Sequence, residues 1–538
     1  MMNSRRILWK NVLLAGLSCV MLINSSCIDY IDNVNPDGIT EDMMAKDNLK
    51  TGSFFAQMLR NVVLFNDGSN LDSDYQVAQA MVGDIFAGYV SSTYAGYNGV
   101  HNASYYFISG WTNMMFEKAY TNIMAPWNSL VTIADEQGLS EVSALATVVK
   151  VAGMHRVADT YGPIPYCNYG SSSTLSSTYD SLEDIYKRFF EELDEAIDVL
   201  TNYVHGNVDA ALLENYDLVY GGDVQKWVKF ANTLRLRLAM RVYYADATLA
   251  QTEAEKSIQN SIGVITAKSD RTELQHTSAL IYHHPLYEIA YDFNNGEARM
   301  SAAMDSYLNG YNDPRLSVYF KAASSDGGYH GVRIGITPSS WGNYSGNLIS
   351  NLNMDDTSTP ITWMTAAESY FLRAEGAVRG WNMGGTAEDL YNQGIETSMD
   401  ENGVSSAYAA YVEDKTSTPA NFEDVVGSES TSALSSITIA WDDTESDEVK
   451  QERIITQKWI AMYPDGPEGW AEFRRTGYPK LFPVVHNNSN GTIDTDIQVR
   501  RSPYPQSEYT TNATGVATGV AKLGGQDNGG TKLWWDKK

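Results

Sequence analysis

Three stretches of this 538-residue chain, at 88–111, 281–300 and 329–344, combine aromatic rings with amide side chains. The chain holds 34 tyrosines and 12 tryptophans but only 15 phenylalanines, a bias toward rings that carry a polar group. Such a ring can stack on the C–H face of a sugar while its polar group reaches a hydroxyl or water. Neighbouring amides and acids add hydrogen bonds, and glycine allows a ligand to approach the backbone closely. The candidate ligand-binding residues are Tyr94, Tyr97, Asn98, Tyr105, Tyr106, Trp111, Tyr291, Phe293, Asn294 and Trp341.

The same loops have two other interpretations. Their rings could pack on the body of the protein, or they could contact a partner protein, because tyrosine and tryptophan are also enriched at protein interfaces. We favour the ligand-binding interpretation, and the sequence leaves the other two open.

Patterns typical of catalysis are missing. The chain contains no HExxH, GxSxG, P-loop, paired CxxC or dinucleotide-binding fingerprint. Its eight histidines are scattered, and the adjacent His283 and His284 would point in different directions on any regular element. We therefore predict no enzyme, no catalytic residue, no metal site and no cofactor. A glycoside hydrolase stays as a less favoured alternative, since with 66 acidic residues some pair will lie near glycosidase spacing once folded.

The charge balance excludes one class of partner. Asp and Glu outnumber Lys and Arg by 66 to 38, which gives a formal net charge of -28. This charge repels nucleic acid phosphates and anionic membranes over most of the surface, so we predict no nucleic-acid partner. It also disfavours polyanionic ligands, unless the site is locally basic.

The N-terminus reads as a targeting segment. Arg5, Arg6 and Lys10 precede an apolar run from about 12 to 23 that is too short to span a bilayer comfortably. Two small serines then lead to Cys27, an arrangement that resembles the lipobox of bacterial lipoproteins, in which the thiol is acylated. We predict a signal peptide over residues 1–26 and lipid attachment at Cys27, which anchors the protein to a membrane through its acyl chains.

Helical periodicity dominates the rest of the chain. Apolar residues recur at spacings of three and four from 179 to 200 and again after Asp223, with N-capping patterns at Ser181, Asp223 and Thr386. No segment alternates as a strand for more than a few residues. We therefore predict an all-α fold. Further helices are expected at 41–65, 73–90, 112–134, 141–158, 365–379, 386–400 and 450–463.

These helices form two groups, at about 41–246 and about 360–480. A variable region at about 270–358 separates them, and an acidic insertion follows at about 401–449. We predict one domain over residues 27–538, with a core built from both groups. The helix lengths are typical of stacked helical hairpins, but the sequence shows no clear 34-residue repeat like that of tetratricopeptide arrays. Any repeat is therefore degenerate.

Seven stretches carry a resemblance to a known family, the SusD/RagB-type nutrient-binding outer-membrane lipoproteins, and most closely to its SusD-like subgroup. They are ADTYGPIPY at 158–166, YDSLEDIYKRFFEELDEAI at 179–197, YGGDVQKWVKFANTLRLRLAMRV at 220–242, DPRL at 313–316, MTAAESYFLRAEGAVRGW at 364–381, YNQGIETSM at 391–399 and QKWIAMYPDGPEGWAEFRRTGYP at 457–479. The resemblance covers nearly the whole chain after Cys27.

The resemblance implies a scaffold of degenerate tetratricopeptide-like helix pairs with long irregular loop insertions. It implies a surface protein of polysaccharide utilization that is anchored in the outer membrane and faces the cell exterior. Such a protein captures oligosaccharides and delivers them to a TonB-dependent, SusC-like outer-membrane barrel. Residues matching the family's scaffold motifs are expected to serve the fold or the barrel contact: Gly222, Asp223, Trp227, Asn232 and Arg235. A binder of peptides or another nutrient, and a purely structural partner of the barrel, remain alternatives.

Overall fold

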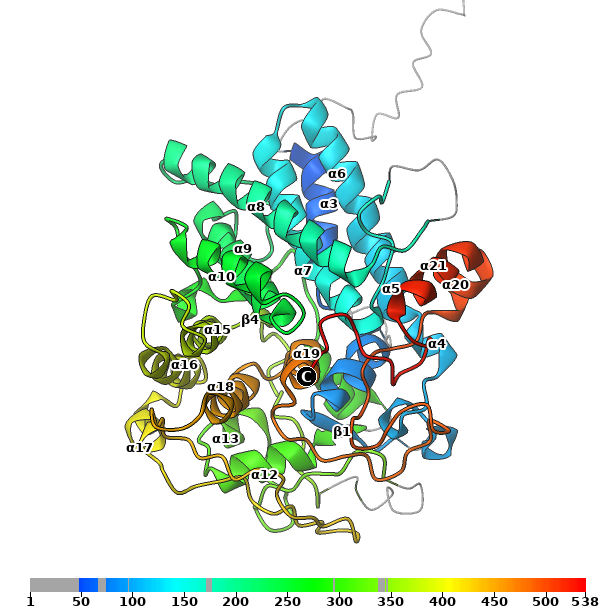
Figure 1. Cartoon of the computed structure of the whole chain (residues 1–538), viewed down its shortest axis with the longest axis vertical. Helices are drawn as coiled ribbons and strands as arrows, with labels where there is room; N and C mark the ends of the chain where they lie inside the picture. The colour runs from blue at the N-terminus through cyan, green and yellow to red at the C-terminus, as the bar shows by residue number, and fades with distance from the viewer. Residues whose placement is uncertain are drawn as a thin grey trace, which may run out of the picture. The chain divides into compact units, whose positions relative to one another are not determined.

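The computed structural model describes residues 48–65, 74–94, 96–170, 177–293, 296–336, 344 and 347–538. Residues 50–538 form one compact unit, and most of its regular structure is helical (Figure 1). The α-helices before the variable region are α3 (Leu49–Leu59), α4 (Ser109–Thr112), α5 (Met114–Ala119), α6 (Ala125–Glu136), α7 (Ser140–Tyr161), α8 (Leu182–Gly206), α9 (Val224–Val242) and α10 (Ala247–Gln259). Those that follow are α11 (Pro285–Tyr287), α12 (Ala302–Gly310), α13 (Leu316–Tyr319), α15 (Ala366–Val378), α16 (Ala387–Glu401), α17 (Tyr408–Val412), α18 (Asp447–Ala461), α19 (Gly466–Thr476), α20 (Gln506–Thr511) and α21 (Ala513–Leu523). The predicted all-α fold is confirmed.

Shorter helical segments complete the framework. Among the described residues, three have π geometry, η2 (Gln76–Asp84), η5 (Tyr120–Met124) and η7 (Glu288–Asp292), and η5 joins α5 to α6 in one run. The 3-10 segments are η3 (Gly96–Gly99), η4 (Asn102–Ser104), η6 (Lys268–Asp270) and η9 (Ser405–Ala407). The predicted helices at 73–90 and 112–134 are thus present, with π-helical stretches inside them.

The predicted N-caps are confirmed. The side chain of Ser181 accepts a hydrogen bond from Asp184 N at 3.1 Å, that of Asp223 from Lys226 N at 3.1 Å, and that of Thr386 from Asp389 N at 3.1 Å. Each cap satisfies a donor that the first helical turn leaves unpaired. Local sequence therefore sets where α8, α9 and α16 begin.

The two helical groups share one core. The pairs α6–α7, α7–α8, α8–α9 and α9–α10 are in contact, and α9 also packs on α15, which in turn packs on α16 and α18 (Figure 1). Four tryptophans are fully buried in this core: Trp227, Trp459, Trp470 and Trp535. Trp227 donates to Asp217 Oδ2 at 2.7 Å, and Asn232 donates to Gly263 O at 2.9 Å. These contacts give both residues a role in the fold.

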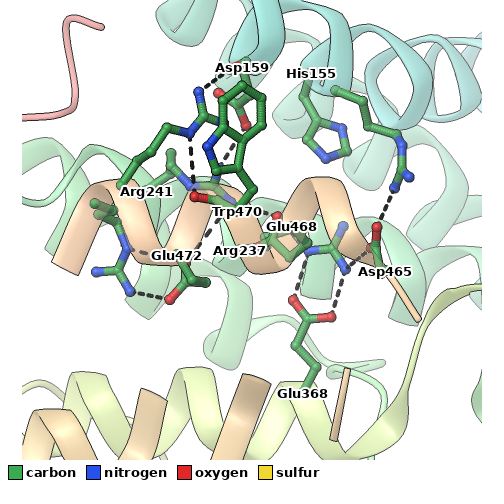
Figure 2. Close-up of polar contacts among 12 residues, drawn as sticks. His155, Asp159, Arg237, Arg241, Glu368, Asp465, Glu468, Trp470 and Glu472 are labelled. Carbon is green, nitrogen blue, oxygen red and sulfur yellow. Dashed lines mark hydrogen bonds and ion pairs between the residues drawn. The ribbon is translucent and has the colours of Figure 1, made fainter. Parts of the chain in front are cut away.

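Buried ion pairs join the groups as well. Arg241 on α9 bonds Asp159 Oδ2 on α7 at 2.8 Å and Glu468 Oε2 on α19 at 2.5 Å (Figure 2). Arg237 donates to both carboxylate oxygens of Glu368 on α15, at 2.7 and 2.6 Å (Figure 2). The five side chains of these ion pairs are at most 6% exposed, so solvent screens their charges only weakly.

Two short antiparallel strand pairs connect distant parts of the chain. β1 (Val90–Ser92) pairs with β3 (Ala298–Met300), with Ser92 opposite Ala298. β2 (Thr272–Leu274) pairs with β4 (Ile361–Met364), which links the start of the variable region to the start of the second helical group. The β1–β3 pair joins the first two aromatic stretches.

Helix α21 lies in a segment where no helix was predicted. Its sequence, ATGVATGVAKL, is rich in Gly and Thr, which are weak helix formers. The glycines are needed for packing: a Cβ at Gly515 would lie 2.1 Å from Ser177 O, and one at Gly519 would lie 2.4 Å from the Tyr179 ring. Close tertiary packing therefore overrides local propensity here.

Candidate functional site

Three rings of the first aromatic stretch gather at the surface. Tyr94 and Tyr97 come from the loop after β1, and Trp111 comes from α4. The centroids of Tyr97 and Trp111 are 5.8 Å apart at an interplanar angle of 82°, those of Tyr94 and Trp111 are 6.4 Å apart at 40°, and those of Tyr94 and Tyr97 are 6.5 Å apart. Tyr97 is 58% exposed, and the other two rings are half-buried. We call these three residues the aromatic platform.

The polar groups of the platform have no hydrogen-bond partner among the described residues. The hydroxyls of Tyr94 and Tyr97 and the indole N–H of Trp111 form no hydrogen bond with any residue that the structure describes. The exposed Asn98 amide beside them is likewise unbonded among those residues. The platform therefore presents both apolar ring surface and free donors and acceptors at one place.

The backbone that carries the platform is strained. Tyr97 and Asn98 have φ of 56° and 57°, and Gly99 follows at 73°, so three successive residues adopt the left-handed region. A non-glycine residue rarely does so, and each instance costs of order 1–3 kcal/mol. Gly96 allows the turn to close, because a Cβ there would lie 2.1 Å from the Tyr94 ring. Strain of this kind concentrates at functional sites.

The buried ring of His101 packs against two rings of the platform. It is 3% exposed, and its ring lies 5.7 Å from that of Tyr94 and 6.2 Å from that of Trp111. Its Nδ1 accepts from Ala103 N at 3.3 Å, which leaves the proton on Nε2, 3.2 Å from Tyr94 O. Burial lowers the pKa of His101, so the ring is neutral at physiological pH. No pattern in the sequence singles out this residue, since its neighbours in space are spread over the loop.

Hydrogen bonds next to the β1–β3 pair hold Thr93, which directly precedes Tyr94 of the platform. Thr93 N and Thr93 Oγ1 both donate to Glu297 O, at 2.7 and 3.0 Å, directly before β3. The Glu297 side chain is 3% exposed and accepts from Gln76 of η2. Burial, followed by the charge of Glu297, raises the pKa of Tyr94, so its hydroxyl remains a donor. The first and second aromatic stretches thus form one structural unit.

The other predicted residues of the first stretch divide into two kinds. Tyr106 is 45% exposed and its hydroxyl has no partner among the described residues. Tyr105 is only 1% exposed and packs edge-on against Phe86 at 6.1 Å, so its burial removes it from the candidate site. Asn102, which lies between the aromatic residues in sequence, is fully buried and donates to Met81 O at 3.0 Å.

The second aromatic stretch contributes no ring to the platform among the described residues. Tyr291 is half-buried, its ring packs at a tilt of 38° against that of Tyr287 with centroids 4.9 Å apart, and its hydroxyl donates to Leu352 O at 3.0 Å. Phe293 is half-buried too, and among the described residues no ring contact joins either of them to the platform. Asn294, Trp341 and the proposed acylation site Cys27 lie outside the described residues.

Among the described residues there is no candidate for a metal site or for a membrane-spanning helix. It contains no group of three or more His, Cys, Asp or Glu side chains placed to hold a metal ion. Nor does any helix within the described ranges have the length and apolarity that crossing a membrane requires.

Comparison with known proteins agrees with the fold. Residues 32–536 match the family model "SusD-like: Susd and RagB outer membrane lipoprotein". A chitin-binding SusD homolog from Flavobacterium johnsoniae is 41% identical with a TM-score of 0.85, covering 91% of this chain and 99% of that one. SusD homologs from Bacteroides uniformis and Bacteroides vulgatus are 37% and 36% identical, each with a TM-score of 0.84 and with 91% of this chain covered against 99% and 98% of theirs. No curated protein matches the chain. The chain belongs to the SusD-like family of outer-membrane lipoproteins.

Proposed function

We propose that this protein binds glycans at the cell surface, captures oligosaccharides on the aromatic platform and delivers them to a TonB-dependent outer-membrane barrel. The protein acts as a binder and not as an enzyme. Acyl chains on Cys27 hold it in the outer membrane, with the platform facing the cell exterior.

The platform is the observation that carries this proposal. Tyr97 and Trp111 meet at 82°, so a sugar ring lying on one of them contacts the edge of the other. Stacking on the rings removes apolar C–H surface from water, and the free tyrosine hydroxyls, the indole N–H and the Asn98 amide can bond sugar hydroxyls. A ligand that is apolar on its faces and polar at its rim matches this arrangement.

Two further observations support the glycan class and the location. The Flavobacterium johnsoniae relative is described as chitin-binding, which makes oligosaccharides of N-acetylglucosamine the first ligands to test. The family is one of outer-membrane lipoproteins, which agrees with acylation at Cys27. Delivery to a SusC-like barrel follows from the resemblance of the scaffold to that family. Tyr106, Tyr291, Phe293, Asn294 and Trp341 remain predicted secondary contacts.

Truncating one platform ring at a time tests the proposal. We expect Trp111→Ala and Tyr97→Ala each to weaken binding of chitin oligosaccharides by about tenfold, since losing a well-placed aromatic contact costs about 1–2 kcal/mol. Isothermal titration calorimetry over a panel of neutral oligosaccharides measures the affinities. Tyr408→Ala is the matched control, because this half-buried tyrosine lies on α17 and should leave binding unchanged.

Two results would overturn parts of the proposal. If the parent binds a glycan and both platform variants bind it equally well, the site lies elsewhere. If the parent binds no glycan on the panel but binds peptides through the same rings, the ligand class is wrong. Release of reducing sugar by the purified protein would contradict a purely binding role.

A further inference from the structure

Two recesses flank the C-terminal segment, residues 532–538. One has a volume of about 520 Å³ and is lined by Lys522, Lys532, Lys537 and Trp534, among others. The other has a volume of about 490 Å³ and is lined by Lys480, Lys532 and Lys538. Lys532 lines both, so the two recesses adjoin. The five lysines are all exposed, and we call them the lysine patch.

Most of the patch is not neutralised by carboxylates. Among the described residues, Lys537 has no hydrogen bond or ion pair, and the Lys480 ammonium contacts only the Tyr478 ring, 4.4 Å from its centroid. Lys522 donates to a backbone oxygen, Tyr179 O, at 2.6 Å. These ammonium groups keep donors free for an anionic ligand, since each carries three N–H bonds.

The remaining two lysines are partly engaged. Lys532 donates to Lys538 O at 2.9 Å and lies 3.9 Å from Asp536, a carboxylate that Arg500 already binds at 2.7 and 2.6 Å. Lys538 alone forms a close ion pair, with Glu448. Asp536 is the acidic residue that lines the first recess, and Asp496 is the one that lines the second. Positive charge therefore exceeds negative charge across both recesses.

Such a patch is unusual on this molecule. The chain carries a formal net charge of -28, and its other lysines are usually matched with acids. Lys187, Lys256 and Lys321 pair with Glu183, Asp194 and Asp355, respectively. Elsewhere in the described ranges, Lys187, Lys268 and Lys415 are exposed as well. Uncompensated lysines concentrated at two adjoining recesses form a local positive field on an acidic surface, which attracts anions.

The walls of the recesses also contain apolar surface. Leu434 and Ile497 in the second recess are 49% and 48% exposed, and Trp534 of the first recess is half-buried. Apolar side chains next to unpaired ammonium groups suit a ligand with apolar ring faces and anionic substituents. The recess volumes are within the range of pockets that bind small ligands, about 300–1,000 Å³.

We propose that the lysine patch is a second binding site, specific for anionic oligosaccharides that carry carboxylate or sulfate groups. The ligand spans the two recesses and places anionic groups near Lys480, Lys532 and Lys537. A flat membrane surface would not enter recesses of this size, whereas an oligosaccharide chain does. None of the lining residues belongs to the aromatic platform, so the site is separate from the one proposed for neutral glycans.

Charge-matched triple variants test this proposal in the full-length protein. The patch variant is K480Q/K532Q/K537Q, and the control is K187Q/K268Q/K415Q, which removes the same charge from exposed lysines elsewhere. Oligogalacturonate and chondroitin sulfate oligosaccharides serve as probes, and affinity is measured by calorimetry. We expect the patch variant to bind either probe at least about tenfold more weakly, and the control to remain within about twofold of the parent.

Further measurements distinguish binding at the lysine patch from binding at the platform and from general attraction between opposite charges. Raising the salt from about 50 to about 500 mM should weaken probe binding, because the attraction is electrostatic. W111A should bind the anionic probes as the parent does, and the patch variant should bind chitin oligosaccharides as the parent does. The proposal is wrong if both triple variants lose affinity equally, or if neither does. It is also wrong if the patch binds vesicles containing phosphatidylglycerol but neither oligosaccharide probe.

Discussion

The Glu375→Gln variant gives the most direct test of how the buried charges stabilise the fold. Glu375 on α15 is 1% exposed, and Arg475 on α19 donates to its two oxygens at 2.7 and 2.8 Å. Arg379 donates a further hydrogen bond at 2.6 Å. Arg475 also pairs with Glu472 at 2.6 Å. Replacing Glu375 by Gln keeps the shape of the side chain and removes one negative charge between two arginines.

The loss of stability expected for Glu375→Gln follows from the pKa of the Glu375 carboxyl. Burial alone would raise the pKa of Glu375, but the charges of Arg475 and Arg379 outweigh burial and lower it from 4.5 to about 2. This difference between unfolded and folded states corresponds to about 3 kcal/mol at neutral pH. Breaking a buried ion pair typically costs about 3–5 kcal/mol, a range that includes the value obtained from the pKa. For a unit of roughly 490 residues, an unfolding entropy of about 2.1 cal/mol/K per residue converts 3 kcal/mol to about 3 °C in Tm.

The effect of pH has a defined sign. Because the folded pKa is lower than the unfolded one, the stabilisation is complete above about pH 4.5 and is lost as pH falls toward 2. Thermal unfolding followed by circular dichroism should therefore show a gap in Tm between parent and variant at pH 7 that narrows by about half near pH 3.

Glu183→Gln is the matched control for this measurement. Glu183 is 46% exposed and pairs with Lys187 one turn along α8, so its loss should cost at most about 0.5 kcal/mol. Equal melting temperatures for the parent and Glu375→Gln at pH 7 would refute the reasoning, and so would a gap that stays constant down to pH 3.

Two other predictions concern the platform and the anchor. Gly96→Ala should weaken binding of chitin oligosaccharides without a large change in Tm, because its Cβ would displace the Tyr94 ring; Gly110→Ala, whose Cβ meets no atom within 4 Å, should change neither. Cys27→Ser should abolish labelling by radioactive palmitate and release the protein from the outer-membrane fraction. The control Cys167→Ser should do neither. Persistent labelling of Cys27→Ser would disprove acylation at that residue.

The helical frame could be predicted because its signals are local. The caps at Ser181, Asp223 and Thr386 and the apolar periodicity of α8 and α9 lie within a few residues of one another. The arginines of α9 show the limit of such signals. Arg237 and Arg241 stand beside the apolar stripe in the sequence, yet both are almost completely buried, because their carboxylate partners come from α7, α15 and α19.

The candidate site could be predicted only in part, for a similar reason. Aromatic composition drew attention to Tyr94, Tyr97 and Trp111, but an irregular loop has no period that separates exposed rings from buried ones such as Tyr105. The lysine patch could not be predicted, since its members are spread over positions 480–538 and the sequence does not show that Lys480 and Lys537 lack a close carboxylate partner among the described residues. Both sites depend on which groups the folded chain leaves unpaired.

The π-helix η2 contacts both α19 and the segment that leads to Trp111. This π-helix packs on α19, where a Cβ at Gly83 would lie 2.6 Å from the backbone nitrogen of Pro467. On its other side, Met81 O accepts the amide of Asn102, whose Oδ1 accepts from Ile108 N at 3.2 Å, just before α4 and Trp111. The strained turn at Tyr97 is thus held between β1 and a segment fixed to η2. Because α19 also carries Glu468, Glu472 and Arg475, η2 joins the buried ion pairs to the segment that carries the platform.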